Sequence, residues 1–353
     1  MTEIPLPDAA CAERARARQD QLTKPTGALG RLEELSVWAA AVQGQCPPQP
    51  FQQVQLTIFA GDHGVARMAR TSAYPPEVTA QMVRNLVSGG AGASVLARLH
   101  GVRLHVIDAA VDCEPDYVND LPADARPDPL TTRIRRGSGS IDREDALTRQ
   151  EVERALALGQ NCADEAIEAG ADLLIVGDMG IGNTTPAAVL VGLLTRHDAA
   201  QVTGRGTGID DATWMRKCTA IREAMRRARP IMGDPLALLA CCAGADLAAM
   251  VGFIGRAAER GVPVILDGTV VTAAALVVDR QHHRARKWWL AGHRSTEPAH
   301  RFALEYLDLE PVADHGMRLG EGTGALMALG TVQSAIALLA QMATFDEAAV
   351  SNR

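Results

Sequence analysis

The clearest candidate for proton chemistry is Glu321, a carboxylate set between glycines in the run Arg318 to Gly324. An uncharged stretch, Thr323 to Thr344, follows it and predicts a buried helix, in a large domain or a subunit contact, rather than a membrane span. A helix N-terminus lowers the pKa of a nearby carboxyl, whereas apolar neighbours such as Leu319 and Ala325 raise it, so the direction of the shift stays open. Glu321 is therefore a candidate general base, and the alternative is a helix cap.

A second motif runs from Gly177 to Thr185 and reads Gly-Asp-Met-Gly-Ile-Gly-Asn-Thr-Thr. Its inner glycines, Gly180 and Gly182, allow the backbone to approach a ligand closely. Asn183 can adopt an unusual backbone conformation, and Thr184-Thr185-Pro186 is typical of the cap and first turn of a helix. Free backbone N–H groups at a helix N-terminus bind anions, so the motif predicts a phosphate site. The alternative is a tight strand-to-helix turn.

This motif is not one of the common nucleotide-binding fingerprints. A dinucleotide fingerprint needs a third glycine where Thr185 stands, and a Walker loop needs a Gly-Lys-Ser/Thr sequence that does not follow here. A nicotinamide-dinucleotide-dependent oxidoreductase is thus disfavoured, although it stays an alternative together with a non-catalytic nucleotide-binding module.

A third motif, Gly204 to Asp211, is another glycine-rich loop that opens a helix, with Lys217 two turns further on. Backbone donors and a lysine could hold a phosphate together, although a flexible loop with a solvated lysine has the same pattern. Asp210-Asp211 resembles a magnesium-binding acidic pair but follows no apolar strand, and Asp267 follows a strand but lacks a second acid. Together with histidine spacings that match no metal template, this predicts neither a metal nor another cofactor.

The elements that must position these residues alternate along the chain. Apolar runs that predict buried strands are Val54 to Ala60, Val102 to Ile107, Leu173 to Val176, Val262 to Leu266 and Trp288 to Ala291. Helical patterns lie between them, for example from about Pro76 to Gly89 and from Thr148 to Ala169. Buried strands separated by helices predict an α/β fold with a doubly wound, mostly parallel, Rossmann-like sheet.

In such a sheet, ligands bind beyond the carboxyl ends of the strands. Glycine-containing polar motifs do follow the strands in this sequence, at Gly61 to Gly64, Gly177 to Thr185, Asp267 to Thr269 and Gly292 to Ser295. We therefore expect them to form one site, in which Asp178, Asp267, Gly268 and Ser295 are further candidates for phosphate or ribose contacts.

Composition limits the class of protein. The chain has 353 residues, of which 47% are hydrophobic and 22% charged, and a net charge of −7, which argues against nucleic-acid binding because phosphate backbones require a basic footprint. Its 7 cysteines form no C-x-x-C pair and are expected to be reduced. The N-terminus lacks the apolar segment of a signal peptide, so we expect a cytoplasmic protein without a membrane anchor.

Taken together, the motifs resemble those of the nicotinate-nucleotide:dimethylbenzimidazole phosphoribosyltransferases. The resemblance covers nearly the whole chain, because its motifs occur in order from residue 24 to beyond residue 340. They are Lys24 to Gly30, Phe59 to Val65, Tyr74 to Met82, Gly177 to Thr185, Gly204 to Asp211 and Arg318 to Gly324.

The resemblance implies a homodimer in which a Rossmann-like domain, residues 51–319, is joined by a small helical domain formed by residues 1–50 and 320–353. It also implies that Glu321 is the general base. The family's phosphate loop matches Gly180, Gly182, Asn183, Thr184 and Thr185, with Lys217 as a further contact. The benzimidazole pocket matches Tyr74, Gln81 and Met82, and we add Leu319 to it.

The implied reaction moves phosphoribose from nicotinate mononucleotide to 5,6-dimethylbenzimidazole and yields α-ribazole 5'-phosphate, for the cobalamin lower ligand, and nicotinate. One position departs from the family, because a glutamate is common where this chain has Asp178. The shorter acid is expected to affect how the substrate is positioned more than the class of reaction.

Overall fold

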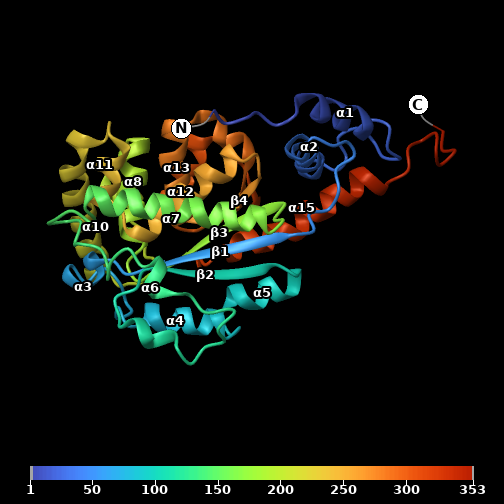
Figure 1. Ribbon diagram of the computed structural model, residues 1–353. Coiled ribbons are helices and arrows are strands. Elements are labelled where there is room, and N and C mark those ends of the chain that lie inside the picture. The colour runs from blue at the N-terminus through green and yellow to red at the C-terminus, as the bar shows by residue number, and fades with distance from the viewer. Residues whose placement is uncertain (1–2, 352–353) are drawn as a thin grey trace.

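The computed structural model describes residues 3–351. Its centre is a six-stranded sheet with the order β2-β1-β3-β4-β5-β6, in which every neighbouring pair is parallel (Figure 1). The strands are β1 (Val54–Gly61), β2 (Arg103–Ala110), β3 (Leu173–Met179), β4 (Val264–Leu266), β5 (Trp289–His293) and β6 (Pro311–Ala313). The predicted α/β fold with a parallel sheet is confirmed.

The strand order places the topological switch point between β1 and β3. From β1 the chain adds β2 on one side, and it then returns to add β3 to β6 on the other side. Connections leaving β1 and β3 thus diverge to opposite edges, which opens a crevice at their carboxyl ends. These ends lie on the side of Figure 1 where α3, α6 and α10 are labelled.

Helices cover both faces of the sheet. On one face lie α12 (Ala245–Glu259) and α13 (Thr269–Gln281), with α7 (Arg149–Glu168) packed on α12, and on the other lie α4 (Val78–Val87), α5 (Gly92–His100) and α15 (Thr323–Gln341) (Figure 1). The closest contact joins α7 and α12. A Cβ atom at Gly159 would lie 1.8 Å from the Ala249 carbonyl oxygen, so only glycine permits this approach.

The remaining helices complete the chain around this core. They are α1 (Ala9–Gln19), α2 (Arg31–Gln43), α3 (Gly64–Met68), α6 (Pro129–Thr132), α8 (Thr184–Thr195), α9 (Ala199–Val202), α10 (Asp211–Ala228), α11 (Pro235–Cys242) and α14 (Pro298–Leu307), with 3₁₀ turns η1 (Pro115–Val118), η2 (Arg229–Ile231) and η3 (His283–Trp288).

The two ends of the chain pack together. Helix α1 lies on α2, α2 lies on α15, and Leu22 forms a β-bridge with Thr344. Arg18 also donates to the Leu339 carbonyl oxygen at 2.9 Å. The first half of α15 nevertheless packs on β5 and α5, so this helix belongs both to the terminal cluster and to the sheet. It is long and apolar enough to cross a bilayer, but 56% of its most apolar window is buried inside the protein, as expected for a core helix.

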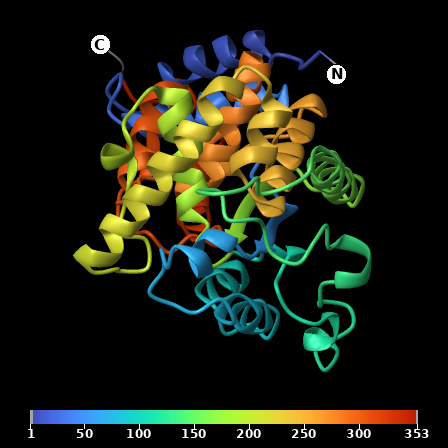
Figure 2. The ribbon, with the colours of Figure 1, turned by 90° about the vertical axis from the view of Figure 1, so that its left-hand side faces the viewer.

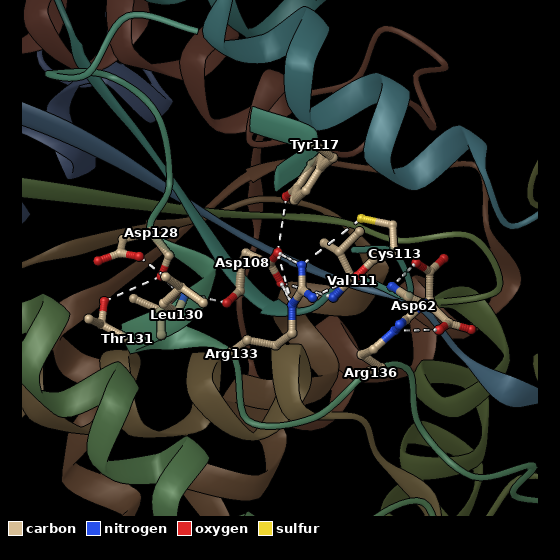
Figure 3. A network of polar contacts seen from close by, with 12 residues as sticks. Asp62, Asp108, Val111, Cys113, Tyr117, Asp128, Leu130, Thr131, Arg133 and Arg136 are labelled. Carbon is tan, nitrogen blue, oxygen red and sulfur yellow. Dashed lines mark hydrogen bonds and ion pairs between the residues drawn. The ribbon is translucent and has the colours of Figure 1, made fainter. Parts of the chain in front are cut away.

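Segment 111–137 forms an excursion between β2 and α7, and Figure 2 shows it looping out beside α4. A buried carboxylate, Asp108, anchors it (Figure 3). Asp108 accepts from the Arg133 guanidinium at 2.6 Å, from the Tyr117 hydroxyl at 3.0 Å and from the Val111 N–H at 2.9 Å. The sequence gives no local signal for this anchor, because the partners of Asp108 lie up to 25 residues away in the chain.

Strand boundaries differ from the sequence expectation mainly at the carboxyl ends. Strand β3 continues through Gly177 and Asp178 to Met179, so these residues belong to the strand and not to the loop after it. The sixth strand, β6, was not expected, because it has three residues and begins with Pro311. Such a short segment at the edge of a sheet leaves no detectable apolar pattern.

Candidate active site

A cavity of about 620 Å³ opens at the carboxyl ends of the strands. Thirteen of the residues singled out from the sequence line it: Tyr74, Met82, Asp178, Gly180, Gly182, Asn183, Thr184, Lys217, Asp267, Gly268, Ser295, Leu319 and Glu321. Two others lie away from its wall in the described chain. Gln81 is exposed on α4, and Thr185 is buried behind the loop, where it bonds the Thr71 hydroxyl at 3.3 Å.

Glu321 sits at the second position of a tight turn at the base of the cavity. The Thr323 N–H donates to the Gly320 carbonyl at 3.0 Å, and Glu321 and Gly322 have φ of 61° and 82°. These φ values are typical of a type I′ turn, in which a residue with a Cβ atom is strained by roughly 1–3 kcal/mol. Glu321 is 3% exposed, and its Oε2 atom has no hydrogen-bond partner among residues 3–351. A strained, buried carboxylate with a free oxygen suits proton transfer.

The structure settles the direction of the Glu321 pKa shift. Burial and, to a smaller extent, the nearby Asp267 carboxylate raise the pKa of Glu321 to about 7, against the opposing effect of a hydrogen bond from the backbone N–H of Ala93. The alternative role as a helix cap does not apply, because Gly322 is the N-cap of α15. Glu321 therefore titrates near neutral pH, where a general base works best.

The cap of α15 comes instead from a distant residue. Asp267, at the tip of β4, accepts from the N–H groups of Gly324 at 2.8 Å and Ala325 at 3.1 Å through Oδ1, and from that of Gly322 at 3.0 Å through Oδ2. The side chain is 1% exposed. Both of its oxygens are thus already bound by the segment that carries Glu321.

The loop after β3 turns toward α8 through its glycines. Gly180 leaves no room for a side chain, because a Cβ atom there would lie 2.0 Å from the Gly61 carbonyl oxygen. Gly182 has a φ of 94°, which favours glycine. The expectation that Asn183 adopts an unusual conformation is wrong, since its φ of −49° and ψ of −36° are helical and it is the N-cap of α8. The residue of this loop with a positive φ is Gly182, for which this conformation is not strained.

Asp178 is a buried acid on the wall of the cavity. Burial and then the nearby Asp246 carboxylate raise its pKa to about 8, and a hydrogen bond from the Asn183 amide opposes the rise. Asp178 is therefore mainly protonated at pH 7 and can donate a hydrogen bond. Asp246 itself is paired behind the wall with His63 at 3.0 Å.

Lys217 joins the two glycine-rich loops. Its Nζ atom donates to the Thr184 hydroxyl at 2.7 Å and to the Gly204 carbonyl at 3.1 Å. The alternative of a solvated lysine is wrong, because Lys217 is 1% exposed. Burial lowers the pKa of Lys217 to about 8, although the nearby Glu297 carboxylate opposes the decrease. An incoming phosphate would add negative charge next to this ammonium group and would favour its protonated form.

Two cavity residues were not assigned a role from the sequence. Glu297, just before α14, is 7% exposed and accepts from the Gly206 N–H at 2.8 Å, so it holds the second glycine-rich loop in place. His293, on β5, is 1% exposed, and its ring nitrogens have no hydrogen-bond partner in the described part of the chain. The contact of Glu297 with Gly206 joins residues 91 positions apart in the chain, so local spacing could not have revealed it.

An apolar part of the wall comes from α4 and the segments beside it. Tyr74, Val78, Met82 and Leu319 line it, which makes a slot suited to a flat aromatic ring. Thr79 fixes the start of α4, because its hydroxyl donates to Asp62 at 2.6 Å and accepts from the Ile181 N–H at 3.0 Å. The cavity thus combines a polar end near Lys217 with an apolar end near α4.

Two other hollows have similar volumes of about 600 and 760 Å³. One lies beside β5 and α14, and the other lies between α1 and α2. Neither is lined by any of the predicted site residues within the described range 3–351. The chemistry expected from the sequence therefore converges on the cavity at the switch point alone.

Comparisons with known proteins agree with this geometry. A family model described as "Phosphoribosyltransferase" matches residues 4–350. The chain is 57% identical over 348 residues to the nicotinate-nucleotide–dimethylbenzimidazole phosphoribosyltransferase of Mycobacterium avium (strain 104), covering 98% of this chain and 96% of that protein. It is 55% identical over 355 residues to the Mycobacterium tuberculosis (strain H37Rv) protein of that name, covering 99% and 94%.

A crystal structure of the enzyme of the same name from Thermus thermophilus has a similar fold. It superposes with a TM-score of 0.90 at 40% sequence identity, covering 98% of this chain and 100% of that one. The similarity therefore spans the sheet, the cavity and both chain ends.

Proposed function

The chain belongs to the nicotinate-nucleotide–dimethylbenzimidazole phosphoribosyltransferase family, and from that premise we propose how its cavity transfers phosphoribose from nicotinate mononucleotide to 5,6-dimethylbenzimidazole. The products are α-ribazole 5'-phosphate and nicotinate. The observation that carries the proposal is Glu321, a buried carboxylate whose Oε2 atom has no hydrogen-bond partner among residues 3–351 and which lines the same cavity as Lys217 and the apolar side chains of Val78 and Met82.

The polar end accepts the nucleotide. Lys217 supplies a positive charge next to Thr184, and the N-terminus of α8 offers backbone N–H groups, so the 5'-phosphate binds there. Asp178, Gly268 and Ser295 lie along the wall toward Glu321, where the ribose follows. Because Asp178 is largely protonated, it can donate to a ribose oxygen without repelling the phosphate.

The apolar end accepts the base. A benzimidazole in the slot formed by Tyr74, Val78, Met82 and Leu319 lies next to Glu321. One ring nitrogen attacks C1′ of the ribose from the face opposite nicotinate, which converts a β-glycosidic bond into an α bond. The electron pair of the broken C1′–N bond returns to the pyridine nitrogen, which was cationic, so nicotinate leaves with a neutral ring and needs no proton.

Glu321 removes the proton that this reaction releases. As the new C1′–N bond forms, positive charge develops on the benzimidazole and its other ring nitrogen becomes acidic. Glu321 accepts that proton, and its pKa of about 7 keeps the carboxylate available at neutral pH. Holding the two rings in line inside the cavity supplies a further part of the rate enhancement.

The test is Glu321→Gln, which keeps the volume of the side chain but removes the proton acceptor. We expect kcat to fall by about a hundredfold or more, with near-normal affinity for nicotinate mononucleotide. In the wild type, kcat should rise with pH through the pKa of Glu321, since only the ionised carboxylate accepts a proton, and the variant should lose this dependence.

Products are measured by mass spectrometry after incubation with nicotinate mononucleotide and the base. Glu310→Gln, at an exposed glutamate on the far edge of the sheet, is the control and should retain full turnover. A Glu321→Gln enzyme that works within about threefold of the wild type would remove Glu321 from the mechanism.

We also propose that the enzyme works in the cytoplasm as a homodimer, as the family resemblance implies. Residues 1–50 and 320–353 form the small helical domain in this proposal, and the contacts among α1, α2 and α15 support it. Sedimentation velocity of the full chain measures the assembly, and a single species with the mass of one chain would contradict the dimer.

A further inference from the structure

We propose that Asp267 is a positioning residue, whose carboxylate holds the Glu321 turn in the conformation from which Glu321 meets the acceptor base. The inference rests on the proposed function of Glu321. It gives Asp267 a role different from the ribose or phosphate contact expected from the sequence.

The first argument is the conformation of the turn. Gly320, Glu321 and Gly322 all have positive φ, at 84°, 61° and 82°, and Glu321 is the one member of the three that has a Cβ atom. Such a conformation persists only where surrounding groups hold it. The three N–H groups bound by Asp267 belong to this turn and to the first turn of α15, which has no side-chain cap of its own. Without Asp267 these donors would be left unpaired in the interior.

The second argument is the rigidity of the platform. Asp267 directly follows β4, which is paired on both sides in the sheet, and its side chain is 1% exposed. The turn also lies directly on the sheet, since a Cβ atom at Gly322 would be 2.5 Å from the Leu56 side chain, and one at Gly177 would be 2.6 Å from the Glu321 carbonyl carbon. Asp267 thus ties Glu321 to the centre of the fold.

Position matters because proton transfer needs hydrogen-bond geometry. A misplacement of about 1 Å can lower a rate by roughly a hundredfold. The nucleotide subsite at Lys217 and Thr184 is held by separate bonds. Loosening the Glu321 turn should therefore lower turnover while leaving nucleotide affinity unchanged.

The charge of Asp267 provides a second readout. It is one cause of the raised pKa of Glu321, so a neutral residue at 267 should lower that pKa. The pH at which kcat rises should then move to lower values. Such a variant retains the other titratable groups of the cavity wall, which are Asp178, Lys217, His293, Glu297 and Arg318. His293 also faces the exchanged carboxylate, since its Nε2 atom lies 3.7 Å from Asp267 Oδ1.

The experiment compares Asp267→Asn, Asp267→Ser, Glu321→Gln and the double variant Asp267→Asn/Glu321→Gln. We expect kcat to fall by about 10- to 100-fold in both Asp267 variants. Their affinity for nicotinate mononucleotide, measured by calorimetry, should stay within threefold of the wild type. The pH at which kcat rises should be lower than in the wild type. Amide hydrogen exchange of the peptide covering residues 320–326 should be faster. The double variant should be no slower than Glu321→Gln, because Asp267 acts through Glu321.

Asp279→Asn is the matched control, since Asp279 is also fully buried but bonds Arg286 far from the cavity. It should leave the pH dependence and the 320–326 exchange unchanged. Wild-type kcat in Asp267→Asn would overturn the inference even if Glu321→Gln is inactive. Equal losses of kcat and nucleotide affinity would assign Asp267 to ribose binding. Failure of both Asp267 variants to fold would assign it a role in folding. Either result would overturn the positioning role. An active Glu321→Gln enzyme would instead remove the proposed base.

Discussion

At the scale of single residues, burial decides what the ionisable groups of the cavity can do. Lys217, Asp178 and Glu321 have pKa values displaced toward neutrality, to about 8, 8 and 7, and burial is the largest cause in each case. Each side chain is therefore close to the point at which it gains or loses a proton. Such displaced pKa values in one cleft are typical of catalytic sites.

Lys217 carries the prediction at this scale. Lys217→Ala removes the charge facing the phosphate, so nicotinate mononucleotide should bind more weakly by roughly 1.5–3 kcal/mol, the range for hydrogen bonds to charged groups. Nicotinate riboside, which lacks the phosphate, should bind as it does to the wild type. Calorimetry with both ligands makes the comparison.

The control for this prediction is Arg216→Ala, which removes an exposed cation one residue earlier on α10 and should leave both affinities unchanged. Equal weakening of nucleotide and riboside in Lys217→Ala would show that the lysine does not contact the phosphate.

At the scale of elements, the cavity depends on how α4 is fixed to the ends of β1 and β3. Thr79 makes this connection, since its hydroxyl is shared between Asp62, which follows β1, and the Ile181 N–H, which follows β3. Thr79 is fully buried. The position of Val78 and Met82 in the apolar slot therefore depends on Thr79, whose side chain does not line the cavity.

Thr79→Val should test this connection, because valine keeps the shape of threonine but removes the hydroxyl. An unpaired, buried N–H at Ile181 should cost about 1–3 kcal/mol of unfolding free energy. We also expect KM for the benzimidazole to rise more than KM for the nucleotide, as α4 loses its anchor. Urea unfolding and steady-state kinetics measure the two effects.

Thr219→Val, at an exposed threonine on α10, is the control for the loss of a hydroxyl. If KM for both substrates rises equally in Thr79→Val, the anchor does not act on the base slot in particular.

At the scale of the whole molecule, stability depends on buried charge pairs as well as on the aliphatic core. The ion pair of Asp108 and Arg133 fixes the 111–137 excursion to the end of β2 (Figure 3). Asp108 is fully buried, and the Arg133 side chain is 8% exposed. Water cannot replace either partner, so removing one of them should lower the free energy of unfolding more than breaking an ion pair at the surface would.

Arg133→Met should lower the free energy of unfolding by about 3–5 kcal/mol, because it leaves the Asp108 carboxylate buried without its counter-charge. Arg136→Met is the control, since Arg136 pairs with Asp112 and Glu114 at the surface and should contribute about 0–1 kcal/mol. Chemical denaturation measures the free energy of unfolding of both variants. Similar decreases in the two variants would contradict the prediction that the buried ion pair contributes more than the surface pair. Turnover at low temperature should survive in Arg133→Met, because neither Asp108 nor Arg133 lines the cavity.

Much of the fold and most of the candidate site residues followed from the sequence itself. Apolar runs located five of the strands. The runs in β3 and β4 are the most continuous, because both strands are buried along their whole length. The glycine-rich motifs fell at the strand ends, so the location of the cavity followed from the rule that parallel strands collect their ligand loops at one edge. Glu321 stood out because it lies between glycines just before an uncharged stretch, and Lys217 stood out because it follows a glycine-rich loop by two helical turns.

The roles of particular side chains were decided only by the tertiary structure. The direction of the Glu321 pKa shift depends on how far the turn is buried and on Asp267, which lies more than 50 residues away in the chain. The burial of Lys217, the displacement of Gln81 and Thr185 from the cavity wall, and the cap that Asp267 gives to α15 likewise depend on long-range packing. Local sequence determines helices, strands and turns, whereas solvation and electrostatic energies depend on every group brought within a few ångströms, and the complete fold alone determines which groups those are.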